Sequence, residues 1–132
     1  MGGTAIGRFP IHLGLGARAV PQPAFTGAME WYADYVARNA DDGREGRLVT
    51  THRFTESWDS WEVHPEGDEV VLCLSGTISL LQELADGPPA QVTLGPGDYA
   101  INPPGVWHTA DIADEASVLF ITAGRETRHR PR

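Results

Sequence analysis

The sequence has no lysine and a single cysteine, and it contains no long apolar run. Its ten basic residues are all arginines and stand against eighteen acidic residues, for a formal net charge of −8. One cysteine, Cys73, excludes an intrachain disulfide and a multi-cysteine zinc site. No run approaches the roughly eighteen apolar residues that a membrane-spanning helix needs. The N-terminal residues also lack the pattern of a secretory signal, so we expect a cytoplasmic protein.

This acidic balance narrows the expected partners. A strongly negative surface repels phosphate backbones and anionic lipid, so we expect no nucleic-acid and no membrane partner. At 132 residues with 41% hydrophobic residues, the chain has the size and composition of one compact domain with a buried core.

Glycine and proline punctuate short apolar runs, a pattern that favours an all-β sandwich or barrel. The 25 glycines and prolines, 15 and 10 respectively, fall mainly at the expected turns. Between them the sequence predicts strands at 48–54, 58–64, 69–74, 77–83, 91–94, 99–102, 106–111 and 117–122. Eight short strands in about 75 residues indicate a small closed barrel or jelly roll.

The chain divides into three predicted parts. Residues 1–45 are expected to form an extended segment, with one strand at 11–17, and an amphipathic helix at 27–39 that packs on the barrel or on a partner. Residues 46–124 form the barrel. Residues 125–132, which carry four arginines, are interpreted as a solvated and partly mobile tail.

Alternation along the predicted strand 58–64 places Glu62 and His64 on one face. A hairpin would return Glu69, at the start of the next strand, beside His64. Two carboxylates and an imidazole inside a barrel are costly unless something neutralises them, and a divalent metal would do so. His108, which follows a Pro-Pro-Gly turn, supplies a candidate second imidazole.

These residues resemble the cupin superfamily, whose two motifs flank a hairpin in a double-stranded β-helix barrel. Glu62-Val63-His64 stands at the His-x-His of the first motif, followed at the family spacings by Glu69 and Gly76. The second motif is matched by Gly97, Pro103, Gly105 and His108. The resemblance implies an all-β cupin jelly roll with metal ligands Glu62, His64, Glu69 and His108.

The sequence departs from the family pattern at three positions. Glu56 and Ile112 replace the first motif's leading Gly and the second motif's closing Asn. Glu62 replaces the first metal-binding histidine, which makes the donors two histidines and two carboxylates. That set suits a divalent Fe, Mn, Zn or Ni ion. In the alternative, metal binding is lost, Glu62 pairs with an arginine such as Arg53, and the histidines are satisfied by hydrogen bonds.

Other residues are candidates for a substrate pocket. His52, Trp58 and Tyr99 are expected to line it, together with Phe54, although aromatic residues in a small barrel are more commonly core. Cys73 is expected to point inward as a small buried side chain. His12 and His129 lie outside the motifs and are assigned no role.

The resemblance implies two functions of different classes. The first is a metal-dependent enzyme, of dioxygenase, isomerase or lyase type, acting on a small oxygen-rich organic molecule. The second is a metal-free module that binds a small molecule without catalysis. A homodimer is expected in either case, because the helix and the lead-in strand exceed what the barrel requires.

Overall fold

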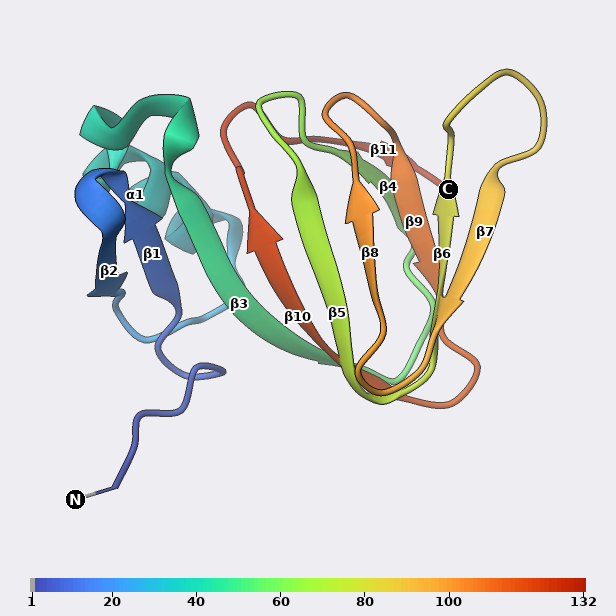
Figure 1. Cartoon of the computed structure of the whole chain (residues 1–132), viewed down its shortest axis with the longest axis horizontal. Coiled ribbons are helices and arrows are strands. Elements are labelled where there is room, and N and C mark those ends of the chain that lie inside the picture. The colour runs from blue at the N-terminus through green and yellow to red at the C-terminus, as the bar shows by residue number, and fades with distance from the viewer. Residues whose placement is uncertain (1) are drawn as a thin grey trace.

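The computed structural model describes residues 2–132 and consists mainly of two antiparallel sheets (Figure 1). One sheet has the order β2-β1-β3-β10-β5-β8, and the other has the order β11-β4-β9-β6-β7. The strands are β1 Ile11–Gly14, β2 Arg18–Pro21, β3 Arg47–Phe54, β4 Ser60–Val63, β5 Glu69–Gly76, β6 Ile78–Gln82, β7 Ala90–Leu94, β8 Tyr99–Asn102, β9 His108–Asp111, β10 Ala116–Thr122 and β11 Arg128–Pro131. The predicted all-β jelly roll with one N-terminal helix is confirmed.

The barrel core forms because alternate residues of the central strands are apolar and point between the sheets. Strands β5, β6 and β10 each begin with a strict alternation of buried and half-buried residues. Their inward side chains form one buried cluster that includes Val71, Cys73, Ile78, Leu80 and Val118. The inward position predicted for Cys73 is therefore confirmed.

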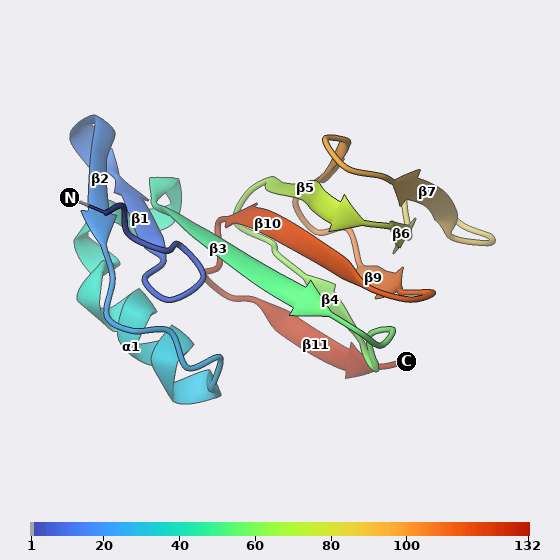
Figure 2. The same cartoon turned by 90° about the horizontal axis from the view of Figure 1, so that it is seen from below.

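A helix and a hairpin cover one end of the barrel. Figures 1 and 2 show α1 (Met29–Arg38) and the β1–β2 hairpin together at one end of the molecule, with β6 and β7 at the other. The helix begins two residues later and ends one residue earlier than predicted. Its Trp31 and Tyr35 form a second buried cluster with Leu48 of β3. Aromatic residues of the predicted helical stripe thus pack on the barrel itself.

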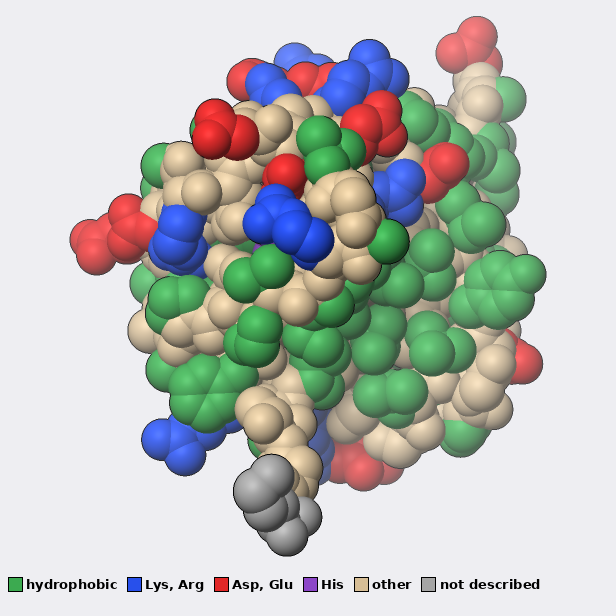
Figure 3. All heavy atoms as spheres, turned by 60° about the vertical axis from the view of Figure 1, so that its left-hand side comes forward, with side chains coloured by type: hydrophobic (Ala, Val, Ile, Leu, Met, Phe, Trp, Pro, Cys, Tyr) green, Lys and Arg blue, Asp and Glu red, His purple; other side chains and the backbone are tan. Residues whose placement is uncertain are grey.

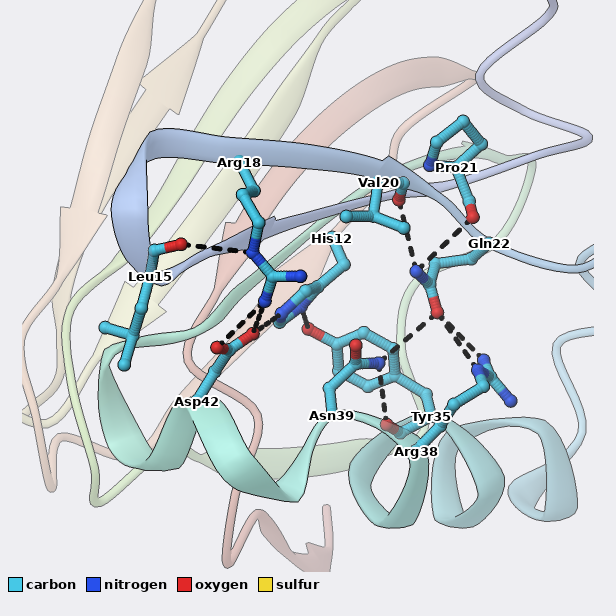
Figure 4. A network of polar contacts seen from close by, with 10 residues as sticks. All are labelled: His12, Leu15, Arg18, Val20, Pro21, Gln22, Tyr35, Arg38, Asn39 and Asp42. Atoms are coloured by element: carbon cyan, nitrogen blue, oxygen red, sulfur yellow. Dashed lines mark hydrogen bonds and ion pairs between the residues drawn. The ribbon is translucent and has the colours of Figure 1, made fainter.

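A buried polar network fastens this N-terminal part together (Figure 4). His12 of β1 is 1% exposed, and its Nε2 donates to Asp42 Oδ2 at 2.6 Å. Its Nδ1 shares a hydrogen bond of 2.6 Å with the Tyr35 hydroxyl of α1. Arg18 of β2 donates to both oxygens of Asp42 at 3.1 Å. The sequence assigned no role to His12, which links β1, β2, α1 and the 3₁₀ turns at Ala40–Glu45.

Two sequence interpretations are corrected. The predicted strand 11–17 is β1 followed by a 3₁₀ turn at Leu15–Ala17, after which β2 returns alongside β1. Residues 125–132 are largely exposed, as expected, but they do not form a loose tail, because Arg128–Pro131 forms β11 and pairs with β4. Arg130 also stacks over the rings of Trp61 and Trp107, at 5.2 and 4.6 Å from their centres.

None of the helices in residues 2–132 is long and apolar enough to cross a membrane.

Candidate metal centre and its cavity

Strand β4 and the turn after it bring the predicted motif residues together. Glu62 lies directly opposite His108 in the ladder between β4 and β9. After His64, a short turn leads into β5, whose first residue is Glu69. His64 Nε2 lies 3.0 Å from Glu69 Oε2, so the two side chains are neighbours as predicted. The predicted hairpin is wrong, however, because β4 and β5 belong to different sheets and the turn crosses from one to the other.

Glu62, His64, Glu69 and His108 converge on one small volume. One donor atom from each side chain lies within 4.8 Å of the donor atoms of the other three. Glu62 Oε1 lies 2.7 Å from His64 Nε2 and 3.5 Å from His108 Nε2, and Glu69 Oε1 lies 3.3 Å from His108 Nε2. Bonds of about 2.1 Å to one ion place neighbouring ligand atoms about 3 to 4 Å apart. The cluster therefore has the spacing of a metal site.

The outer ring nitrogens of both histidines are held by hydrogen bonds. His64 Nδ1 lies 2.8 Å from Thr127 Oγ1, and that hydroxyl donates its own proton to Gly124 O. Thr127 Oγ1 therefore accepts the His64 Nδ1–H. His108 Nδ1 donates to Val106 O at 3.3 Å. When neutral, both imidazoles thus turn an Nε2 lone pair toward the cluster, which is how histidine ligands are usually oriented.

The inner nitrogens, by contrast, have no hydrogen bond. His64 Nε2 and His108 Nε2 are buried and lack a well-directed partner among residues 2–132, although carboxylate oxygens lie at contact distance. Buried polar atoms ordinarily have a partner. Two imidazole nitrogens and two carboxylates are a ligand set that binds divalent Fe, Mn, Zn and Ni. The residues present therefore fit a divalent ion and could hold one.

Glu69 is fixed by neighbours from two other strands. Its side chain is 2% exposed, and Asn102 Nδ2 donates to its Oε1 at 3.0 Å. Thr122 Oγ1 donates to its Oε2 at 2.7 Å. Gln82 in turn donates to Asn102 Oδ1 at 2.7 Å, so a buried relay orients the carboxylate. Hydrogen bonds of this kind position a ligand before any ion binds.

The four groups strongly shift one another's ionisation. Burial raises the pKa of Glu69, but the contacts with His108 and His64 outweigh it and lower that pKa to about 2. For Glu62, three neighbouring imidazoles likewise outweigh burial and hold its pKa well below the usual value. Burial lowers the pKa of His64 and His108, whereas the two carboxylates raise it to about 10 and about 9. Without an ion, the positive charges of two imidazolium groups balance the negative charges of the two carboxylates. A bound dication would replace the two imidazolium protons and keep the same charge balance.

His129 also belongs to this site, although it lies outside the sequence motifs and was assigned no role. It lies opposite Glu62 in the ladder between β11 and β4, and its Nε2 lies 2.9 Å from Glu62 Oε2. The contact with Glu62 raises the pKa of His129. Its arginine-rich surroundings carry no local signal of a site residue, and only the pairing of β11 with β4 places it there. The pairing of Glu62 with Arg53, which the metal-free alternative suggested, is not found, because Arg53 forms its ion pair with Glu115.

A cavity of about 1010 Å³ adjoins the cluster. Glu62, His64 and Glu69 form part of its wall, and helix α1 and strand β3 form other parts. His52, Trp58 and Phe54 line the cavity, but Tyr99 does not, and its side chain is 65% exposed. The buried residue of β8 is Asn102. Because Tyr99 precedes it by three positions, alternation turns Tyr99 to the outer face.

The geometry defines a class of protein: a small two-sheet barrel with a cluster of histidines and carboxylates that opens onto a cavity. The sequence model of the cupin domain matches residues 55–124, just over half of the chain. The chain therefore belongs to the cupin domain family. No curated protein matches it.

Solved structures share the fold at low sequence identity. A cupin-2 domain protein from Shewanella frigidimarina is 21% identical, with 65% of this chain and 71% of that one covered at a TM-score of 0.49. A cupin protein from Bacteroides fragilis is 17% identical, with coverages of 61% and 67% and a TM-score of 0.50. Hydroquinone 1,2-dioxygenase from Sphingomonas sp. TTNP3, solved with 4-hydroxybenzoate bound, is 18% identical, with 58% of each chain covered and a TM-score of 0.50. These similarities concern the fold.

Proposed function

We propose that this protein binds one divalent transition-metal ion through Glu62, His64, Glu69 and His108, and that it acts on a small oxygen-bearing organic molecule in the adjoining cavity. The proposal rests on two buried Nε2 atoms that lack a well-directed hydrogen bond and that lie, together with two carboxylates, around one point. Dioxygenase or isomerase chemistry is the reaction type that we infer. The dioxygenase fold neighbour lends support by analogy alone.

The two carboxylates of the cluster would have different roles once an ion and a ligand are bound. A bound dication would polarise a ligand oxygen or, if it is iron, supply redox chemistry with dioxygen. Glu69 is locked by Asn102 and Thr122, so it serves as a fixed ligand. Glu62 is less buried than Glu69 and lines the cavity. It is the carboxylate better placed to exchange a proton with a bound ligand.

A metal-free binding protein is the second candidate, and one observation favours it. With the pKa of His64 at about 10 and that of His108 at about 9, the cluster is charge-balanced without any ion. In that state the cavity would bind a small molecule without catalysis. The two candidates differ in whether a stoichiometric metal accompanies the folded protein.

Elemental analysis of untagged protein separates them. The wild type is expected to carry about one transition-metal ion per chain, and the His64→Ala/His108→Ala double variant none. The Glu115→Gln variant is the control, since Glu115 pairs with Arg53 away from the cluster. An absence of metal in the wild type, even after anaerobic reconstitution with Fe(II) and Mn(II), would leave the metal-free candidate.

The proposal includes a homodimer formed through the outer face of the six-stranded sheet. Cross-strand rows of apolar side chains cover this face: Ile121, Val70 and Ile101 form one row, and Leu119, Leu72 and Tyr99 form the next. Figure 3 shows apolar side chains gathered on one side of the molecule. A continuous exposed apolar patch is typical of an interaction surface. A cytoplasmic location, compatible with the free thiol of Cys73, stays a prediction.

A further inference from the structure

We infer that the cavity accepts an uncharged aromatic molecule carrying hydroxyl or carbonyl oxygens, and that it discriminates against carboxylates. This inference deepens the proposed function by naming a ligand class. It rests on that function only in taking this cavity as the binding site. Three features of the residues that line the cavity support it: their aromatic rings, their charges and an unused hydrogen-bond donor.

Aromatic rings from separate parts of the chain form one wall. Phe54 of β3 lies 5.6 Å from the ring of Trp58 and 6.2 Å from that of Phe120 of β10. His52 contacts the same cluster, with its ring 5.6 Å from that of Phe120, and Tyr32 of α1 also lines the cavity. Tilted and edge-to-face contacts are the arrangement that rings prefer. A flat aromatic ligand would extend this set of contacts.

The charges along the wall disfavour an anion. Among the described residues that line the cavity, four are acidic, namely Glu56, Asp59, Glu62 and Glu69. Arg53 is the one arginine in that lining, and Glu115 already pairs with it. A dication, or two imidazolium groups, would cancel Glu62 and Glu69. The negative charges of Glu56 and Asp59 would remain, and they would repel a negatively charged ligand. The affinity for carboxylates should therefore be low.

One residue that lines the cavity, Trp58, carries a hydrogen-bond donor without an acceptor. The indole Nε1–H of Trp58 is buried and has no partner among residues 2–132. Buried indole N–H groups usually have one. An oxygen on the ligand would supply it. Apolar walls with a few placed polar groups are the usual composition of small-molecule sites, and the cavity volume is at the upper end of their range of about 300–1,000 Å³.

Three matched probes test the inference by isothermal titration calorimetry. They are 4-hydroxybenzyl alcohol, 4-hydroxybenzoate and the saturated 4-(hydroxymethyl)cyclohexanol. We expect the aromatic alcohol to bind about tenfold or more tightly than either of the others, since the second probe adds a charge and the third removes the ring. Titrations use the metal-free protein and the Zn(II)-loaded protein, and the same order is expected in both.

Two variants assign the preference to the wall. Glu56→Lys is expected to tighten the binding of 4-hydroxybenzoate about threefold or more and to leave the affinity for 4-hydroxybenzyl alcohol unchanged. The exposed Glu45, outside the cavity lining, gives the matched control Glu45→Lys. Phe54→Leu is expected to weaken the binding of 4-hydroxybenzyl alcohol about fivefold. Phe9 lies outside the cavity lining, so Phe9→Leu should leave that affinity unchanged.

Equal or tighter binding of 4-hydroxybenzoate, equal binding of the saturated alcohol, or no binding of any probe at millimolar concentration would overturn the inference. These outcomes are separable from failure of the proposed metal. If no metal binds but the expected order holds in the metal-free protein, the ligand class stands and the metal proposal falls. If Zn(II) binds and the order fails, the ligand class alone falls.

Discussion

Glu62 changes the charge of the centre as well as one of its ligands. With three histidines and one carboxylate a dication would leave a net positive site, whereas two carboxylates and two imidazoles balance it. The carboxylate occupies the space expected for an imidazole, since its Oε1 lies 2.7 Å from His64 Nε2. Carboxylate oxygens are harder donors than imidazole nitrogens and favour Mn or Fe over softer ions.

Replacing Glu62 by glutamine should weaken metal binding more than about tenfold, because even neighbours of metal ligands contribute about 10- to 100-fold in affinity. Competition with a chromophoric chelator measures the change. Glu115→Gln removes an equal charge outside the cluster and should leave the affinity unchanged. Wild-type affinity in Glu62→Gln would mean that Glu62 is no ligand.

His52 should make the metal-free protein less stable in mild acid. Burial among aromatic rings lowers its pKa, and only Glu62 and Glu69 oppose that shift. The unfolded chain therefore binds the proton more readily. The stability that the neutral ring contributes is present above the unfolded pKa of about 6.5 and is lost as the pH falls toward the folded value. Urea unfolding of metal-free wild type and His52→Leu at pH 7.5 and 5.5 measures this. The raised pKa values of His64 and His108 favour the folded state in acid in both proteins. Between pH 7.5 and 5.5 the free energy of unfolding should therefore change more favourably in the variant than in the wild type, and an equal change would contradict the assignment.

The barrel strands and helix α1 were predictable from local sequence patterns, whereas strand β11 was not. Alternation and Gly/Pro turns located the eight barrel strands, since both signals are local. Strand β11 was missed because Arg128, Arg130 and Arg132 indicate a solvated segment. A guanidinium group can nevertheless stack on a tryptophan face while it pairs with an acid, as that of Arg130 does with Trp107 and Glu83. Tyr99 was misplaced because the register of β8 depends on its partner strand.

Strand β11 contributes to the centre through His129, which holds the outer oxygen of Glu62. His129→Phe should weaken metal binding about tenfold, and His129→Gln, which keeps a donor, should recover much of it. Competition with a chelator measures the metal affinity of each protein. Denaturation of the metal-free forms shows whether a variant is also less stable, so that a loss of ligand positioning can be told from a loss of folding. Equal affinities in all three proteins would remove His129 from the site.

The β5–β6 turn is the tightest point of the barrel. Gly76 has φ +73°, and a Cβ there would lie 2.0 Å from Glu115 O. Gly76→Ala should lower the free energy of unfolding by about 3 kcal/mol or more, because it adds a backbone clash to an unfavourable φ. Gly87 also has a positive φ but open space, so Gly87→Ala should cost only about 1 kcal/mol. Urea denaturation compares the two, and equal losses would show that the clash relaxes.

At the scale of the whole molecule, the apolar outer face of the six-stranded sheet should join two copies. Ile101 lies on the edge strand β8 and is 47% exposed. Ile101→Lys should convert a dimer into a monomer in sedimentation velocity, because it places a charge in an apolar interface. Leu84→Lys alters a residue of comparable exposure, 55%, in the β6–β7 loop, and this variant should stay dimeric. A monomeric wild type at high micromolar concentration would contradict the proposed dimer.

We propose above all that the two sheets hold a metal ion at one defined point. Anomalous X-ray diffraction from crystals grown with Mn(II) or Zn(II) can locate that ion. We expect one strong peak per chain, about 2.0–2.3 Å from donor atoms of Glu62, His64, Glu69 and His108. A peak elsewhere, or none at this cluster with the four side chains ordered, would contradict it.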